Sequence, residues 1–192
     1  KKIMFSDKYC LTLAVLYGIK TMTRRLLKEG TPLGNWEETA KCLPYKVGDI
    51  VAIAQPYKDI IESMAEYSDI IINVDGSINR EYKAGWTNKM FVKADLMPHH
   101  IRITDVKIEH LQDISDKECL REGVKRASIG FYAEGVKVKD WEKEAHRETA
   151  SGCLKLFPFP RPAFASLIDK ISGKGTWESN PWVVTYSFEL VD

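Results

Sequence analysis

The sequence predicts an α+β domain, in which a small antiparallel β-barrel is flanked by helices and extended by two inserts. Two observations from composition and pattern support the α+β class. Short β-prone runs alternate with turn residues, and helical periodicity is confined to a few segments. The 192 residues suffice for one domain, which we assign to residues 1–192 with inserts at about 57–87 and 124–157.

The N-terminal part is expected to contain one helix that ends just before the most polar segment of the chain. Asp7 is a suitable N-cap, and residues 8–17 place four large side chains on one helical face: Tyr9, Leu13, Leu16 and Tyr17. Gly18 falls where the C′ glycine of a helix belongs. The helix should therefore bury one face and release the chain at Gly18.

Residues 18–25 read Gly-Ile-Lys-Thr-Met-Thr-Arg-Arg and are locally basic, because no acidic residue occurs between Asp7 and Glu29. A lysine point charge, an arginine fork and two hydroxyls suit a phosphate, a carboxylate or a polarised carbonyl. The formal net charge of the whole chain is only +1, so an anionic partner would have to be recognised by a local patch of this kind.

The conformation of this basic segment decides which side chains act together. In a strand, Thr21, Thr23 and Arg25 share one face. In a helical turn, Lys20 neighbours Thr23 and Arg24. The β-branched threonines favour the strand, and a bulge could bring Lys20 and Thr23 to one site. The sequence leaves both arrangements open.

Turn residues divide the rest of the chain into short expected elements. Up to residue 111 these are a loop at 28–45, a strand at 50–55, a helix at 57–67, a hairpin of 70–74 with 77–82, a strand at 89–94, and a strand at 101–111 bulged near Asp105. Beyond it they are a helix opened by the capping box Ser115–Glu118 and stopped by Gly123, a helix around 141–149, a helix from Pro162 to Ile171, a loop at 176–180, and a strand at 182–190.

The spacing Gly-x-Lys-Thr-x-Thr-x-Arg at Gly18, Lys20, Thr21, Thr23 and Arg25 resembles the motif of the ASCH family. Further segments look like those of phage and prophage ASCH proteins, at residues 4–9, 45–51, 88–91, 98–103 and 179–183. The resemblance implies a PUA-like barrel fold. It also implies a cleft between the barrel and a flanking helix in which RNA or modified bases bind.

The first functional hypothesis is a protein that binds RNA or a nucleotide-like small molecule in such a cleft. The ligand-binding residues would be Lys20, Thr21, Thr23 and Arg25, joined by Arg102 and Trp182. Loop tryptophans can stack on unpaired bases, which contributes about 1–3 kcal/mol per base. Oligomeric state, ligand identity and base preference are not specified by the sequence.

The alternative is an enzyme. Some small ASCH proteins resemble amidohydrolases of N4-acylated cytosine nucleosides, and by position their catalytic lysine and threonine correspond to Lys20 and Thr23. A lysine of lowered pKa could accept the proton of a threonine nucleophile. The family's glutamate is missing, because Arg102 stands at its place, and Asp105 or Glu109 would have to substitute from the same strand.

Two other function classes are compatible with the sequence. In a non-catalytic interaction module, Lys20 and Arg25 would form salt bridges that hold the cleft together, although exposed pairs contribute only about 0–1 kcal/mol. A metal-dependent ribonuclease would need oxygen ligands such as Asp95, Asp105 and Glu109, but no dense carboxylate cluster is present.

Cysteine and histidine usage argues against disulfides and metal. The cysteines are far apart and form no Cys-x-x-Cys pair: Cys10, Cys42, Cys119 and Cys153. This favours reduced, packed thiols in a reducing compartment, and we expect a cytoplasmic protein without membrane contact. The adjacent His99 and His100 have no partner at metal-ligand spacing, so neither a metal nor a cofactor is expected.

Overall fold

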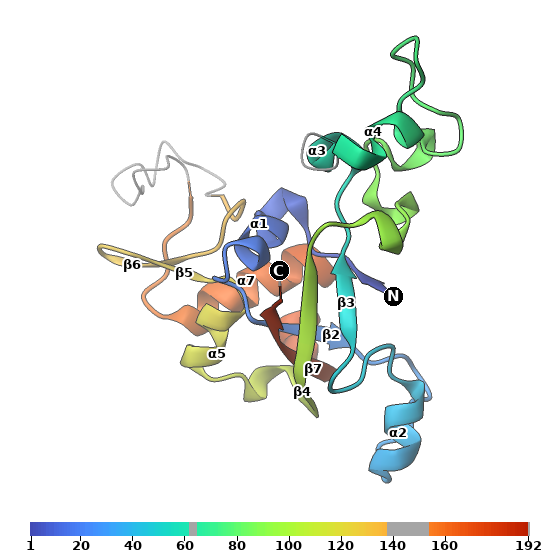
Figure 1. The fold of residues 1–192 in the computed structure, drawn as a ribbon. Helices are drawn as coiled ribbons and strands as arrows, with labels where there is room; N and C mark the ends of the chain where they lie inside the picture. The colour runs from blue at the N-terminus through green and yellow to red at the C-terminus, as the bar shows by residue number, and fades with distance from the viewer. Residues whose placement is uncertain (62–64, 138–153, 192) are drawn as a thin grey trace.

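The computed structural model describes residues 1–61, 65–137 and 154–191, and its centre is a mixed five-stranded sheet (Figure 1). The strand order is β1-β3-β4-β7-β2. The strands are β1 (Lys2–Ile3), β3 (Ile50–Ile53), β4 (His100–His110), β7 (Trp182–Leu190) and β2 (Met22–Leu26). β1 runs parallel to β3, and the other neighbours are antiparallel. The predicted α+β class is confirmed.

The sheet is not closed into a barrel, so this part of the prediction is wrong. β1 and β2 are its two edges and form no ladder with each other. β1 has only two residues, because the chain leaves the sheet at Met4 and enters the 3₁₀ helix η1 (Asp7–Tyr9). A hydrogen bond links β2 to the residue after β1: Arg25 Nη2 donates to the Met4 carbonyl at 2.5 Å.

The two longest strands, β4 and β7, pair along most of their length and carry the core. Their register shifts between Ile103 and Asp105, which confirms the bulge predicted in this strand. β7 has the predicted bounds, and β3 starts as predicted and ends two residues early. The side chains of these strands that face inward pack against α7 (Pro160–Ser172) through Leu167 and include Ile101, Ile103, Val184, Tyr186 and Phe188.

The N-terminal helix is shorter than predicted. The expected helix at 8–17 is divided at Cys10, whose φ of 52° is left-handed, so η1 is followed by a separate helix α1 (Leu11–Leu16). Gly18 ends this region with a φ of 69° and donates its N–H to the Val15 carbonyl, as expected for a C′ glycine. The chain then enters β2, which confirms the extended conformation for residues 22–26.

Helices α5 (Asp116–Arg121) and α7 begin at signals visible in the sequence. The capping box of Ser115 and Glu118 is present in both directions. α7 begins at Pro160, two residues before the predicted start, and ends before Gly173. The expected loop at 176–180 instead contains the short helix α8 (Thr176–Ser179), and η5 (Leu111–Asp113) follows β4.

Several predictions between residues 28 and 97 are wrong. The expected loop at 28–45 contains helix α2 (Trp36–Cys42), whose N-cap Asn35 accepts a hydrogen bond from the Glu37 N–H. The expected strand at 89–94 is replaced by two 3₁₀ turns, η3 (Lys89–Phe91) and η4 (Ala94–Leu96). Apolar side chains of this region form a separate small core around Tyr57, which the β-prone pattern of the sequence did not reveal.

The structure differs from the prediction in both segments that were expected to be inserts. In the first, α3 (Tyr57–Ile60) and α4 (Ala65–Ile71) replace one long helix, η2 (Lys83–Gly85) follows, and the hairpin is reduced to a single bridge between Ile72 and Ile78. In the second, β5 (Lys125–Ala127) and β6 (Gly130–Tyr132) form an unpredicted hairpin. The helix expected around 141–149 lies outside the described residues.

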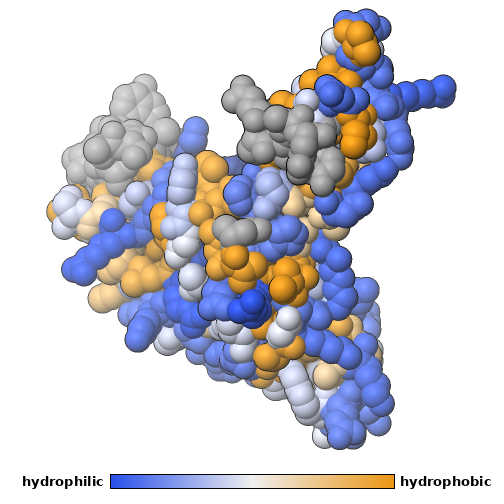
Figure 2. All heavy atoms as spheres, in the orientation of Figure 1, coloured by the Kyte–Doolittle hydropathy of each residue, from blue (hydrophilic) through white to orange (hydrophobic). Residues whose placement is uncertain are grey.

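Figure 1 shows α3 and α4 beyond one end of the sheet, and α2 on a separate projection. The face drawn in Figure 2 mixes hydrophilic and hydrophobic residues, with hydrophobic ones gathered at the centre of the body. Among the described residues, none of the helices has the length and apolar character needed to cross a membrane.

The described cysteines are free, with Cys119 buried and Cys42 exposed, whereas Cys153 lies outside the described residues. Burial raises the pKa of the Cys119 thiol to about 12.

Candidate ligand-binding and catalytic pocket

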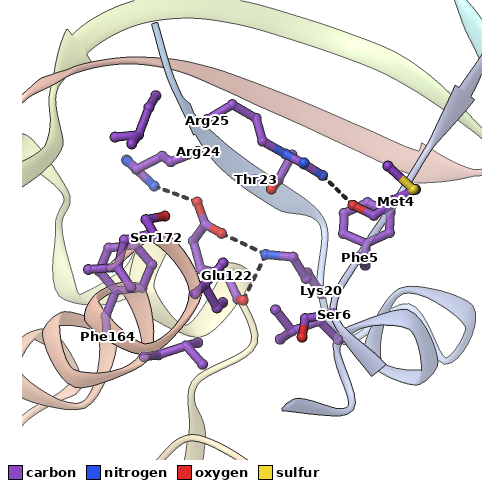
Figure 3. Close-up of a pocket in the computed structure, with 15 residues that line it drawn as sticks. Met4, Phe5, Ser6, Lys20, Thr23, Arg24, Arg25, Glu122, Phe164 and Ser172 are labelled. Carbon is purple, nitrogen blue, oxygen red and sulfur yellow. Dashed lines mark hydrogen bonds and ion pairs between the residues drawn. The ribbon is translucent and has the colours of Figure 1, made fainter. Parts of the chain in front are cut away.

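A cavity of about 150 Å³ lies where the sheet fails to close (Figure 3). One wall comes from residues 4–6 after β1, and another from Lys20 and residues 23–26 of β2. The end of α5 contributes Glu122, and α7 contributes a mostly apolar wall. The pocket is therefore apolar in the main, with seven polar or charged residues in its lining: Ser6, Lys20, Thr23, Arg24, Arg25, Glu122 and Ser172.

Lys20 is almost completely buried and forms an ion pair with Glu122. Its Nζ donates to Glu122 Oε2 at 2.6 Å and to the Glu122 carbonyl at 2.8 Å. The two side chains are 2% and 5% exposed, respectively. Burial lowers the pKa of Lys20, and although the Glu122 carboxylate opposes this, the pKa stays below its ordinary value. Two donors of the ammonium are used, which leaves one for a ligand.

Glu122 reaches Lys20 because of the way α5 ends. Its N–H donates to the Glu118 carbonyl at 2.9 Å, so Glu122 is the C-cap residue of the helix. Gly123 follows with a φ of 103°, and a Cβ there would lie 2.9 Å from Leu11 Cδ2. Only glycine combines this conformation with so close an approach to α1. The turn thereby brings α5 and the Lys20 side chain together.

Arg24 lies behind this pair and is surrounded by carboxylates. Its Nη1 is 3.2 Å from Glu122 Oε1, and its Nη2 is 2.7 Å from Glu109 Oε1 and 3.2 Å from Glu118 Oε2. The Nη2 contacts are ion pairs without aligned hydrogen bonds, and Nε has no hydrogen-bond partner among the described residues. The side chain of Arg24 is fully buried, so its charge is neutralised inside the protein.

Thr23 places a hydroxyl in the same pocket. It pairs with Tyr186 across the β2–β7 ladder and is 5% exposed. Figure 3 shows its side chain on the same side of β2 as Lys20 and Arg25. No hydrogen bond of the Thr23 hydroxyl is present within residues 1–61, 65–137 and 154–191. Its hydroxyl is therefore available to a ligand.

Arg25 differs from the other cations of the motif. Its guanidinium donates to the Met4 carbonyl and lies 5.8 Å from the centroid of the Phe5 ring. No carboxylate pairs with it in the part of the chain that the structure describes. The motif thus contributes two buried, neutralised cations and one partly exposed cation at the rim of the cavity.

The other three predicted ligand-binding residues lie outside this pocket. Thr21 accepts a hydrogen bond from Arg121 Nε at 3.0 Å. Arg102 pairs with Glu189 at 3.2 Å, with both side chains about half exposed. Trp182 stacks on His110 with ring centroids 3.9 Å apart. The structure therefore does not bring the six predicted residues into one cleft. Arg102 lies on β4 and Trp182 is the first residue of β7, and neither lines the pocket.

Glu122 is a candidate site residue that the sequence did not predict. The expected substitutes do not reach Lys20: Asp105 is exposed, and Glu109 contacts Arg24 instead. One signal was present in the sequence. A glutamate at a helix C-terminus faces the negative end of the helix dipole, so it needs a cation from elsewhere in the fold. Among the described residues, no group of three His, Cys, Asp or Glu side chains could hold a metal ion.

No family model and no curated protein matches this chain. Two solved structures are similar at low identity. An ASCH domain from Lactobacillus crispatus JV V101 is 16% identical over 97% of this chain and 75% of its own, with a TM-score of 0.37. A protein of Enterococcus faecalis V583 assigned to the family model DUF984 is 15% identical over 100% of this chain and 80% of its own, with a TM-score of 0.43. Both TM-scores are below 0.5, so the fold and the site rest on the geometry described above.

Proposed function

We propose that the protein is a hydrolase that cleaves an N-acyl bond of a small nucleoside-like molecule bound in this pocket. The observation that carries the proposal is the buried Lys20–Glu122 pair, 2.6 Å apart, beside the unbonded hydroxyl of Thr23. A nucleophile, a base and an acid that orients the base are the parts that covalent acyl transfer needs.

Each residue has a defined role in this reaction. Thr23 Oγ attacks the acyl carbon, and its proton passes to the neutral amine of Lys20. When the C–N bond breaks, Lys20 returns this proton to the leaving nitrogen. Water then attacks the acyl-threonine ester and gives one proton to Lys20, which passes it to Thr23 Oγ as the carboxylic acid leaves. Glu122 holds Nζ in place throughout, and burial favours the neutral amine that the first step requires.

The dimensions and charges of the pocket favour a small molecule over a nucleic-acid chain. A cavity of about 150 Å³ holds roughly one aromatic ring. The walls supply apolar contacts through Phe5 and Phe164, as expected for the faces of a base. Lys20 and Arg24 are already neutralised by carboxylates, so they do not provide the open basic surface that binding of a phosphate backbone needs.

The test is hydrolysis of N4-acetylcytidine and its larger N4-acyl homologues by the full chain. Thr23→Val, Lys20→Met and Glu122→Gln should each lower kcat/KM by about 10²–10⁴-fold. Thr21→Val is the matched control, because Thr21 is a neighbouring threonine of the same motif that lies outside the pocket. Hydrolysis by Thr23→Val at the wild-type rate, or no hydrolysis of any of these compounds by the wild type, would contradict the proposal.

RNA binding is the second candidate function, and the observation that favours it is Arg25. This cation has no carboxylate partner among the described residues and reaches the rim of the pocket. Binding of short fluorescent RNAs at two salt concentrations tests it. If RNA binds here, Arg25→Ala should weaken binding and reduce its salt dependence, whereas Lys20→Ala should matter less, because Glu122 neutralises Lys20. Equal RNA affinity of wild type and Arg25→Ala would exclude this site.

A further inference from the structure

Behind the pocket, charged side chains from three elements form one connected group. Arg24 comes from β2, Lys107 and Glu109 from β4, and Glu118 and Glu122 from α5 or its C-cap. The arginine is the only one of these five residues whose side chain is fully buried. The reaction described above gives it no role.

The two oxygens of Glu122 face different cations. Oε2 accepts from Lys20 Nζ at 2.6 Å, whereas Oε1 lies 3.2 Å from Arg24 Nη1. With one oxygen held by each cation, the plane of the carboxylate is fixed and one oxygen stays directed at Lys20 (Figure 3). A lysine that acts as a base depends on such orientation, because its amine must stay within reach of the nucleophile.

Arg24 is itself held by carboxylates that are fixed from the other side. Lys107 Nζ lies 2.9 Å from Glu109 Oε2 and 2.7 Å from Glu118 Oε1. Thr185 Oγ1 donates to Glu109 Oε1 at 2.7 Å. These contacts keep the two carboxylates in front of the guanidinium, so Arg24 has little freedom to turn away from Glu122.

We propose that Arg24 is a positioning residue of this pocket, which holds the Glu122 carboxylate against Lys20 and places its own positive charge near the lysine amine. The catalytic meaning of this inference rests on the proposed hydrolase, but the effect on Lys20 is a property of the folded protein and can be measured without a substrate.

The charges around Lys20 give the direction of the effect. Burial lowers its pKa, Glu122 raises it, and the positive charges of Arg25 and Arg24 lower it further. The residues of α7 that line the pocket carry no charge: Phe164, Leu167, Ile168, Ile171 and Ser172. Glu109 and Glu118 contact Arg24, Lys107 contacts these two carboxylates, and none of the three is paired with Lys20. Loss of the Arg24 charge should therefore raise the pKa of Lys20.

The experiment is an NMR titration of the Lys20 side-chain amine in labelled protein, assigned with Lys20→Met. Arg24→Met/Glu109→Gln removes the guanidinium together with one carboxylate that it neutralises, so that fewer buried charges are left unpaired. We expect the midpoint of Lys20 to rise in this variant. Arg24→Lys keeps the charge and should restore a midpoint close to that of the wild type. Lys107→Met is the matched control, since it changes the same group without touching Glu122.

Activity gives a second readout. In Arg24→Met/Glu109→Gln, the rising limb of the pH profile of kcat/KM should move to higher pH by as much as the Lys20 midpoint does. In Lys107→Met it should stay in place. An unchanged Lys20 midpoint in the folded double variant, or an equal shift in Lys107→Met, would overturn the inference. A wild type that hydrolyses no N4-acyl nucleoside would reject the hydrolase alone, because the Lys20 titration does not depend on it.

Discussion

Two arginine–glutamate pairs of this protein have the same N–O distance, but one pair is buried and the other is exposed to solvent. Arg24 Nη1 and Glu122 Oε1 are 3.2 Å apart, with side chains 0% and 5% exposed. Arg102 Nη1 and Glu189 Oε1 are also 3.2 Å apart, but their side chains are 49% and 55% exposed. In water the attraction is screened, whereas in the interior the same contact neutralises charges that have lost their hydration. Burial, and not distance, therefore decides which pair matters to the fold and to the site.

The largest expected effect is the difference between the two arginines. Arg24→Met leaves three carboxylates around a neutral side chain, and we expect it to lower the free energy of unfolding by about 3–5 kcal/mol. Arg102→Met should change it by about 0–1 kcal/mol. Urea unfolding of both variants provides the comparison. Equal stability of the two would show that the Arg24 group contributes no more than a surface pair.

A glycine pair extends the comparison to the backbone. Gly123 and Gly76 both have a positive φ, of 103° and 79°. A Cβ at Gly123 would meet Leu11 at 2.9 Å, whereas a Cβ at Gly76 has no atom within 4 Å. Both substitutions carry the strain of a positive φ, about 1–2 kcal/mol, and Gly123→Ala should cost more than Gly76→Ala because Leu11 Cδ2 must also move, as measured by thermal or urea unfolding.

Gly123→Ala should also weaken hydrolysis, because the turn carries Glu122 toward Lys20. A variant that keeps full stability at Gly123 would contradict the close approach of this turn to α1.

The smallest of these effects concerns acid stability. Burial alone would raise the pKa of Glu118, but hydrogen bonds from Lys107 and Ser115 and the charge of Arg24 outweigh it and lower the pKa to about 2. A depressed pKa means that the stabilisation is present above the ordinary value of 4.5 and is lost as the pH falls toward 2. Since the side chain is partly exposed, we expect about 1–2 kcal/mol from this group.

The measurement is the free energy of unfolding between pH 5 and pH 2 for wild type, Glu118→Gln and Glu189→Gln, a range that brackets both values for Glu118. The decline in this window should be shallower in Glu118→Gln than in Glu189→Gln, which removes one carboxylate from the exposed pair. Identical slopes would show that Glu118 is not held by Lys107 and Arg24 in solution.

The parts of the fold that the sequence predicted well are those with local causes. The capping box at Ser115, the C′ glycine at Gly18 and the long closing strand β7 each depend on residues a few positions apart. The prediction of a strand at 89–94 was wrong because this region packs around Tyr57 and forms 3₁₀ turns, in spite of a weak β preference. The prediction of a closed barrel was wrong because β1 ends at Ile3 and does not pair with β2, and the pattern of the sequence does not show where β1 ends.

By itself, the sequence determined the α+β class, favoured the extended course of the basic motif and indicated Lys20 and Thr23 as candidate site residues. The tertiary structure alone decided the partner of Lys20. Glu122 is 102 residues from Lys20, and the pairing depends on the packing of α5 against α7 and β2. Local spacing carries no information on such a contact, and it also cannot show that Arg24 is buried while Arg25 is not. The same packing turns a basic segment of the sequence into an enclosed, nearly neutral pocket.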